Sequence, residues 1–183
     1  MKILRKLLVV CLTLATIFSG MSLLGVAAQG NEMTDQQIKL ISNNCLSAKN
    51  TLNQLHVSDA LLRVNMGQMY ESMSTKLMDR FNSRVTNNNF NNIDLVSTTK
   101  SYGLMLDTFR LDYKTYEEQL SSALAIDCTK QSVAFYDAVS VTRTERDQVH
   151  TDVVKLNQYI DQYQSAVNQF EKDYQASVKE TKN

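Results

Sequence analysis

The sequence predicts an all-α fold, a long antiparallel three-helix bundle of coiled-coil type that follows an N-terminal export segment. Two observations predict it. Apolar or small residues return every three or four positions over most of the chain, which is the spacing of one helix face. Proline is absent from all 183 residues, and only Gly67 and Gly103 of the five glycines lie beyond residue 30. Long helices are therefore free of the strongest helix breakers.

The first 28 residues have the pattern of an export segment. Three positive charges within the first six residues precede an apolar run over residues 7–18, and a small-residue cleavage site ends at Ala28. Cleavage there leaves one domain, residues 29–183. The alternative is an uncleaved signal anchor, because residues 7–28 carry no charge and about 20 apolar residues span a bilayer. In both cases the rest of the chain is expected outside the cytoplasm, secreted or anchored through residues 7–28.

The first helix is predicted over about residues 34–86. It begins with a capping box, because the Thr34 hydroxyl and the Gln37 side chain are spaced to bond each other's backbone amides. Its apolar seam follows Ile38, Ile41, Cys45, Ala48, Leu52, Leu55, Leu62, Met66, Met69 and Met73, and then, shifted by one residue, Leu77, Phe81 and Val85. Asp59 interrupts this seam.

The second and third helices are predicted over about residues 92–126 and 131–179. The asparagine-rich stretch 87–92 separates the first two, because asparagine competes with the helix for backbone hydrogen bonds. A loop at 126–131 is expected because one helix of roughly 90 residues would exceed ordinary lengths. The stripes are Tyr102, Leu106, Phe109, Tyr113, Tyr116, Leu120 and Leu124, then Val149, Val153, Leu156, Ile160, Tyr163, Val167, Phe170 and Tyr174.

Two cysteines remain after the leader, Cys45 and Cys128. A hairpin that reverses between residues 85 and 93 places Cys45 opposite residue 133, about 7 Å from Cys128 at the helical rise. A few unwound residues after Leu124 would close this gap, since an extended residue advances about 3.3 Å. We therefore predict a disulfide, which the compartment permits. The alternative is two buried thiols that pack as small hydrophobes.

Possible metal ligands are few. Met66, Met69 and Met73 place thioethers along one side of the first helix, and such ligands hold Cu(I). Core packing is the favoured interpretation, so no metal and no other cofactor is predicted. His56 and His150 are the only imidazoles, and neither has a partner at ligand spacing.

The other candidate site residues are interpreted as structural. Asp59 lies at an apolar seam position, and Arg143 and Arg146 lie in the polar part of the third helix, so ion pairs or a wetter stretch are expected. The remaining seam residues are Leu62, Phe109, Tyr113, Tyr116, Val153, Leu156, Ile160 and Tyr163. For the tyrosines, an exposed aromatic surface for a partner or a glycan is the alternative to core packing.

Charge and motifs exclude several functions. Without the three basic residues of the leader, 16 basic groups face 19 acidic ones, which argues against nucleic-acid binding. Phosphate-loop, metalloprotease and nucleophile-elbow motifs are absent, so no enzyme is predicted and no catalytic residue is named. We predict a non-enzymatic envelope or secreted module whose long helical surface binds another envelope or surface protein or itself. The alternative is an extracytoplasmic carrier of a small ligand or copper.

Three short stretches carry a resemblance. Residues 74–78 (STKLM), 126–131 (IDCTKQ) and 134–139 (AFYDAV) are similar to uncharacterised secreted helical proteins of reduced-genome bacterial lineages. The likeness covers most of the chain after the leader. It implies a secreted bacterial helical protein and brings no known activity, ligand or catalytic residue.

Overall fold

The structure is a computed structural model that describes residues 33–180 of the chain. The chain divides into two units, and every helix described lies in the second, Thr34–Asn183. The predicted export segment, residues 1–28, lies outside the described residues. Residues 33–180 contain only helices and their connections, so the all-α class is confirmed.

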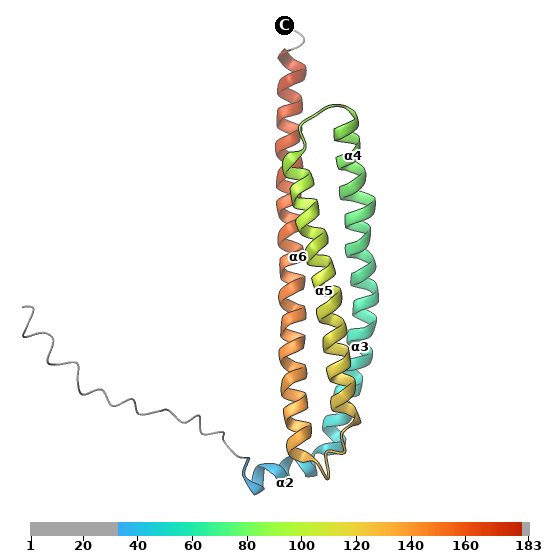
Figure 1. Cartoon of the computed structure of the whole chain (residues 1–183), viewed down its shortest axis with the longest axis vertical. Helices are drawn as coiled ribbons and strands as arrows, with labels where there is room; N and C mark the ends of the chain where they lie inside the picture. Colours follow the sequence, from blue (N-terminus) through green and yellow to red (C-terminus); the bar gives the residue numbers. More distant parts are fainter. Residues whose placement is uncertain (1–32, 181–183) are drawn as a thin grey trace, which may run out of the picture. The chain divides into compact units, whose positions relative to one another are not determined.

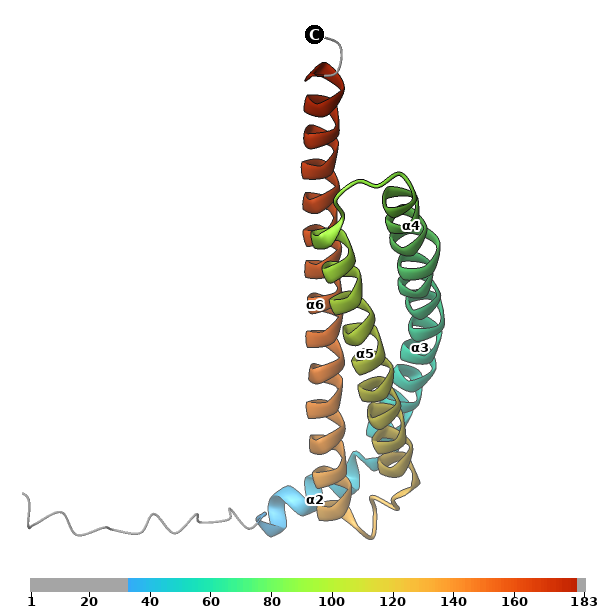
Figure 2. The same cartoon turned by 45° about the horizontal axis from the view of Figure 1, so that its top comes forward.

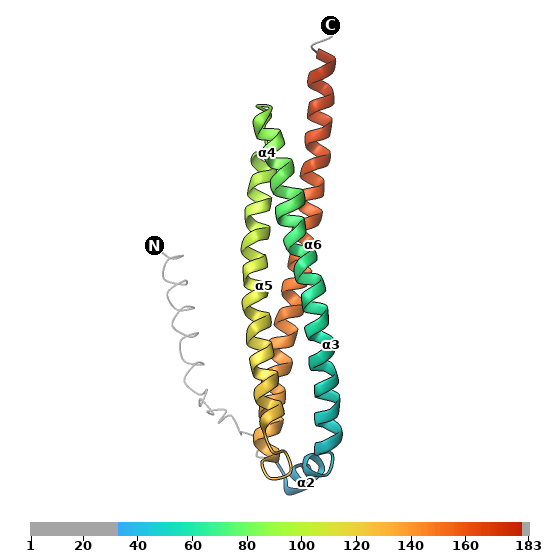
Figure 3. The same cartoon turned by 90° about the vertical axis from the view of Figure 1, so that its right-hand side faces the viewer.

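Three long antiparallel rods make up this unit (Figure 1). The elements in order are α2 (Asp35–Asn43), α3 (Cys45–Ser72), the π-helix η1 (Met73–Met78), α4 (Asp79–Asn87), α5 (Ile93–Ala125) and α6 (Ser132–Glu180). α3, η1 and α4 run end to end as the first rod, α5 returns beside it, and α6 runs in the direction of α3 (Figure 3). The C-terminal end of α6 extends past the α4–α5 turn (Figure 2).

The first rod differs from the single helix predicted over residues 34–86. The capping box is present, since Gln37 N donates to Thr34 Oγ1 at 3.3 Å and Thr34 N donates to Gln37 Oε1 at 2.8 Å. The helix then breaks at Asn44, whose backbone lies at φ −98° and ψ 7° and whose Nδ2 donates to Leu40 O at 2.8 Å. Because asparagine offers the backbone such local bonds, α2 ends here and α3 starts in a new direction.

The π-helix η1 accounts for the shift in the apolar seam after Met73. Its hydrogen bonds reach five residues back, as from Asp79 N to Ser74 O, so one extra residue enters the turn. The residues that follow are rotated with respect to the seam. Met78 and Val85 are buried, whereas Leu77, predicted to lie in the seam, is 57 % exposed.

Tyrosine hydroxyls bond the carbonyls at both ends of η1. Tyr102 on α5 donates to Tyr70 O at 3.0 Å, three residues before η1. The Tyr163 hydroxyl of α6 lies 2.8 Å from Asn82 Oδ1 and 3.2 Å from the carbonyl of Met78, the last residue of η1, and shares its one proton between these two acceptors. Carbonyls lose regular helical partners where the bonding pattern changes, and buried backbone groups need replacements. The second and third rods therefore hold the π-turn in place.

The core is asymmetric. α5 and α6 pack closely along their length, whereas α3 lies farther from both. Long side chains bridge the wider gap, and the largest fully buried ones include Tyr70, Tyr102, Tyr116, Met78, Leu95, Leu120 and Leu156. None of the helices within residues 33–180 has the length and apolar character needed to cross a membrane.

The two ends of the bundle are closed differently. At one end a disulfide joins Cys45 at the start of α3 to Cys128 in the α5–α6 connection, with 5.5 Å between the Cα atoms, which confirms the predicted pairing. At the other end the asparagine-rich turn passes through Asn89, a left-handed residue at φ 60°. There the Phe90 ring packs edge-on against Tyr174 of α6.

Candidate functional site

A stretch of α3 between Asp59 and Tyr70 has little cover from the other rods. Asp59 and Tyr70 are 8 % and 0 % exposed, yet none of residues 60–69 is buried. Several of these uncovered side chains are apolar, namely Leu61, Leu62, Val64 and Met69. Exposed apolar side chains gathered in one short stretch of a helix are a feature of interaction sites in soluble proteins. We therefore take this stretch, with the hollows beside it, as the candidate site.

Asp59 connects all three rods. Arg146 Nε of α6 donates to Asp59 Oδ2 at 2.8 Å, and the Tyr116 hydroxyl of α5 donates to the same oxygen at 2.7 Å. Burial alone would raise the pKa of Asp59, but the hydrogen bonds from Arg146 and Tyr116, with the charge of Arg146, hold this pKa below its usual value. Asp59 is therefore a carboxylate paired with Arg146, while Arg143 is exposed.

The same contacts act on the Tyr116 hydroxyl. Burial raises the pKa of Tyr116, and its hydrogen bond to the Asp59 carboxylate raises this pKa further. The phenol therefore keeps its proton and acts as a donor to Asp59. Asp59, Tyr116 and Arg146 are hydrogen-bonded to one another, so the arrangement is structural. None of the three is left free to act as a general base.

An inner hollow lies next to this ion pair. It has a volume of about 350 Å³ and is lined by Asp59, Leu62, Arg63, Met66, Phe109, Tyr113, Tyr116, Arg146, Asp147, Val149, His150 and Val153. α3 and α6 supply opposite walls, and the aromatic residues of α5 lie between them. The Arg63 guanidinium carbon lies 4.9 Å from the centroid of the Tyr113 ring, a cation–π distance. Apolar side chains dominate this hollow.

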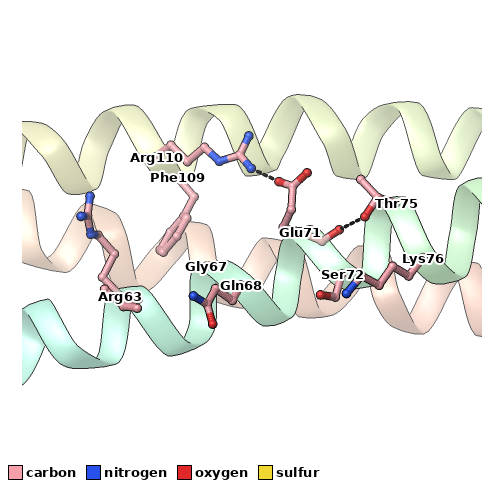
Figure 4. Close-up of a pocket in the computed structure, with 10 residues that line it drawn as sticks. Arg63, Gly67, Gln68, Glu71, Ser72, Thr75, Lys76, Phe109 and Arg110 are labelled. Carbon is pink, nitrogen blue, oxygen red and sulfur yellow. Dashed lines mark hydrogen bonds and ion pairs between the residues drawn. The ribbon is translucent and has the colours of Figure 1, made fainter.

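An outer hollow of about 520 Å³ lies on the other side of α3, toward α5 (Figure 4). Arg110 reaches across it to pair with Glu71 (Figure 4). Arg110 also bonds Asp107 at 2.9 Å. A Cβ added at Gly67 would meet nothing within 4 Å, so close packing does not require this glycine. Most of the remaining residues that line the outer hollow are polar or charged, so its lining is more polar than that of the inner hollow.

A buried carboxyl pair lies at the α5–α6 interface. Asp152 is fully buried, Gln148 Nε2 donates to its Oδ1 at 3.1 Å, and its Oδ2 meets no N–H or O–H donor among the described residues. Burial first, and then the neighbouring Asp112 carboxyl, raise the pKa of Asp152 to about 6. The raised pKa favours a protonated Asp152, whose carboxyl can donate to the neighbouring Asp112 carboxylate.

The predicted seam residues are mostly in or against the core. Phe109, Tyr113, Tyr116, Leu156 and Tyr163 are buried, and Val153 and Ile160 pack partly buried against the core. Leu62 differs from the prediction, since it is 55 % exposed at the inner hollow. The heptad position is apolar as expected, but α3 stands too far from α6 there for its side chain to be covered.

The sulfur and imidazole candidates do not gather into one site. Met66 and Met73 pack against the core, whereas Met69 is 41 % exposed. His56 Nε2 lies 3.8 Å from Glu117 Oε1, and His150 lies on the rim of the inner hollow. Within residues 33–180 no three His, Cys, Asp or Glu side chains are close enough to hold a metal ion.

Of the buried polar residues of the described part of the chain, only Asp59 was singled out from the sequence, and Asp152 and Asn82 are two that were missed. Asp152 lies three residues after Val149 and four before Leu156, a helical spacing that places it on the buried stripe. Asn82 follows Met78 by four residues, and its Nδ2 donates to Thr99 Oγ1 at 2.8 Å. Extending the apolar periodicity through polar positions would have found both.

Comparison with protein-family models, with curated proteins and with solved structures finds no match to this chain. The resemblance to secreted bacterial helical proteins therefore stays a prediction. The function is inferred from the residues and from their geometry alone.

Proposed function

We propose that this protein is a non-enzymatic interaction module of the cell envelope or the secreted fraction. Its three-helix, coiled-coil-like bundle presents a long helical surface to another envelope or surface protein, or to a second copy of itself. The observation that carries the proposal is an outward apolar stripe on α3.

The α3 stripe consists of Leu46, Val57, Leu61 and Val64, which are 74 %, 73 %, 64 % and 47 % exposed. Their separations of 11, 4 and 3 residues keep them on one side of the helix, opposite Asp59 and Tyr70. Single exposed apolar residues are ordinary, but an aligned set along a rod is typical of helix-mediated contacts. The stripe runs through the stretch that the other rods leave uncovered.

The proposed location rests on the leader and on the disulfide. The charge pattern before residue 7 favours translocation of the remaining chain, either with cleavage after Ala28 or with residues 7–28 as an anchor. A Cys45–Cys128 disulfide is consistent with an oxidising, extracytoplasmic compartment. We propose no cofactor and no nucleic-acid partner.

Site-specific photocrosslinking in cells that make the protein tests this proposal. A benzophenone side chain at Leu61 is expected to give one adduct of defined mass, whereas the same side chain at Val154 of α6 gives none. Both positions are exposed, at 64 % and 42 %. The residues three, four and seven positions away from Val154 are all polar, so it belongs to no apolar stripe. No adduct from position 61, or equal adducts from both, would contradict the proposal.

Sedimentation separates the two kinds of partner. If a second copy is the partner, association increases with protein concentration and is lost in Leu61→Lys but retained in Val154→Lys. If another protein is the partner, the purified chain stays monomeric while the Leu61 adduct persists in cells. If the purified protein is a monomer and position 61 also gives no adduct in cells, both self-association and binding to another protein are contradicted.

A further inference from the structure

We infer that the inner hollow between α3 and α6 binds a small organic carboxylate with an aromatic or branched apolar body. This inference concerns the interior side of α3 and does not depend on the proposed function, which uses its outward stripe.

The size and lining of the hollow fit a small apolar group. Its volume of about 350 Å³ lies at the lower end for small-molecule sites, which are concave and mainly apolar with a few polar groups. Phe109 and Tyr113 offer aromatic surface, and Met66 offers an adaptable thioether. Leu62 lines the hollow while 55 % exposed, so a bound apolar body would cover it.

The charges of the hollow favour an anion. Arg63 on α3 and Arg146 on α6 bring guanidinium groups from opposite walls. No carboxylate of the described residues lies within 4.0 Å of Arg63, which instead packs on the Tyr113 ring. Arg146 uses Nε and Nη2 for Asp59, and its Nη1 has no partner among residues 33–180. Guanidinium groups with free N–H donors are suited to binding carboxylates.

The acidic groups of the hollow do not cancel this preference. The Asp59 carboxylate already accepts from Arg146 and Tyr116, so it is neutralised by bonds within the protein. Asp147 is exposed on the rim, where water screens its charge. A carboxylate placed between the two arginines therefore meets two cations, the Asp59 carboxylate that is already paired, and Asp147 on the exposed rim.

A charge series on one apolar scaffold tests the inference. The exported protein, with its disulfide intact, is titrated by calorimetry with 4-phenylbutyrate, 4-phenylbutan-1-ol and 4-phenylbutylamine. We expect the carboxylate to bind at least about tenfold more tightly than the alcohol, and the amine to bind least. Equal affinities for the three compounds, or no heat from the carboxylate up to about 5 mM, would overturn the inference.

Matched variants place the binding in the inner hollow. Arg63→Gln is expected to weaken phenylbutyrate binding by about tenfold or more, and Met66→Trp, which fills the hollow, to abolish it. Lys76→Gln, in the lining of the outer hollow, is the control and leaves binding unchanged. If Met66→Trp fails to fold, Leu62→Trp at the exposed edge of the hollow decides, because Leu62 lines only the inner hollow whereas Arg63 lines both. Binding unchanged in Leu62→Trp would overturn the inference. Binding unchanged in Arg63→Gln would overturn the inference.

Discussion

Replacing Asp152 with asparagine is expected to stabilise the protein at neutral pH. Asp152 is fully buried beside Asp112, and its pKa is raised from 3.8 to about 6. The folded state therefore holds a proton that the unfolded chain releases, and its stability falls as the pH rises from about 4 to about 6. A difference of about two pKa units corresponds to about 3 kcal/mol, an upper value because the two carboxyls titrate together.

Asparagine is close in shape to the protonated aspartic acid. Its amide can donate to Asp112 as the carboxylic acid can, and its carbonyl can accept from Gln148. Asp152→Asn is therefore expected to match the original protein near pH 4 and to exceed it by up to about 3 kcal/mol at pH 7.5. For a domain of this size the gain corresponds to about 6–12 °C in Tm.

Urea unfolding followed by circular dichroism at several pH values between 4 and 7.5 measures this difference. The control is Asp161→Asn, an exposed aspartate on the same helix, which should leave the pH dependence of the wild-type protein intact. A variant that is less stable than the wild type at pH 7.5, or a stability difference that does not change with pH, would refute the account of a protonated Asp152.

Three further changes test other contacts by urea unfolding. Tyr163→Phe removes the buried hydroxyl that bonds the end of η1 and should cost about 1–2 kcal/mol; no loss would show that the π-turn holds without it. Arg146→Met should cost about 1–3 kcal/mol at pH 7 and progressively less as the pH falls below 3.8, because the unfolded chain then protonates Asp59 while the lowered pKa keeps the folded carboxylate ionised; a loss that does not change with pH would contradict the ion-pair reasoning. Replacing both Cys45 and Cys128 by serine should cost up to about 4.5 kcal/mol, and an unchanged urea midpoint would show that the bond constrains nothing.

The helices and the disulfide could be predicted from the sequence because they depend on the spacing of residues along the chain. Apolar spacing places the stripes that contain Phe109 and Leu156, and a run of asparagines ends a helix at Asn87. Helical rise and the position of that turn are then enough to bring Cys45 near Cys128. Each of these inferences uses distances along the chain that are fixed by backbone geometry.

The candidate site could be predicted only in part, because some of its features depend on how far apart the helices pack. Asp59 stands out because it breaks an apolar seam, and Arg146 lies in the polar part of the third helix, so their pairing was within reach. The exposure of Leu62 was not, because it depends on how far α3 stands from α6. That separation depends on how long side chains such as Tyr70 pack between the rods, which apolar periodicity does not encode.

The Cys45–Cys128 bond also determines how tension would pass through the protein. When force is applied between a point before Cys45 and the C-terminal end of α6, it passes through the S–S bond. This bond is part of the shortest covalent path between the two points. The hairpin of α3, α4 and α5, spanned by a sequence separation of 83 residues, is left out of the mechanical path. Oxidation therefore removes roughly 290 Å of extensible chain, and only reduction would let the hairpin stretch.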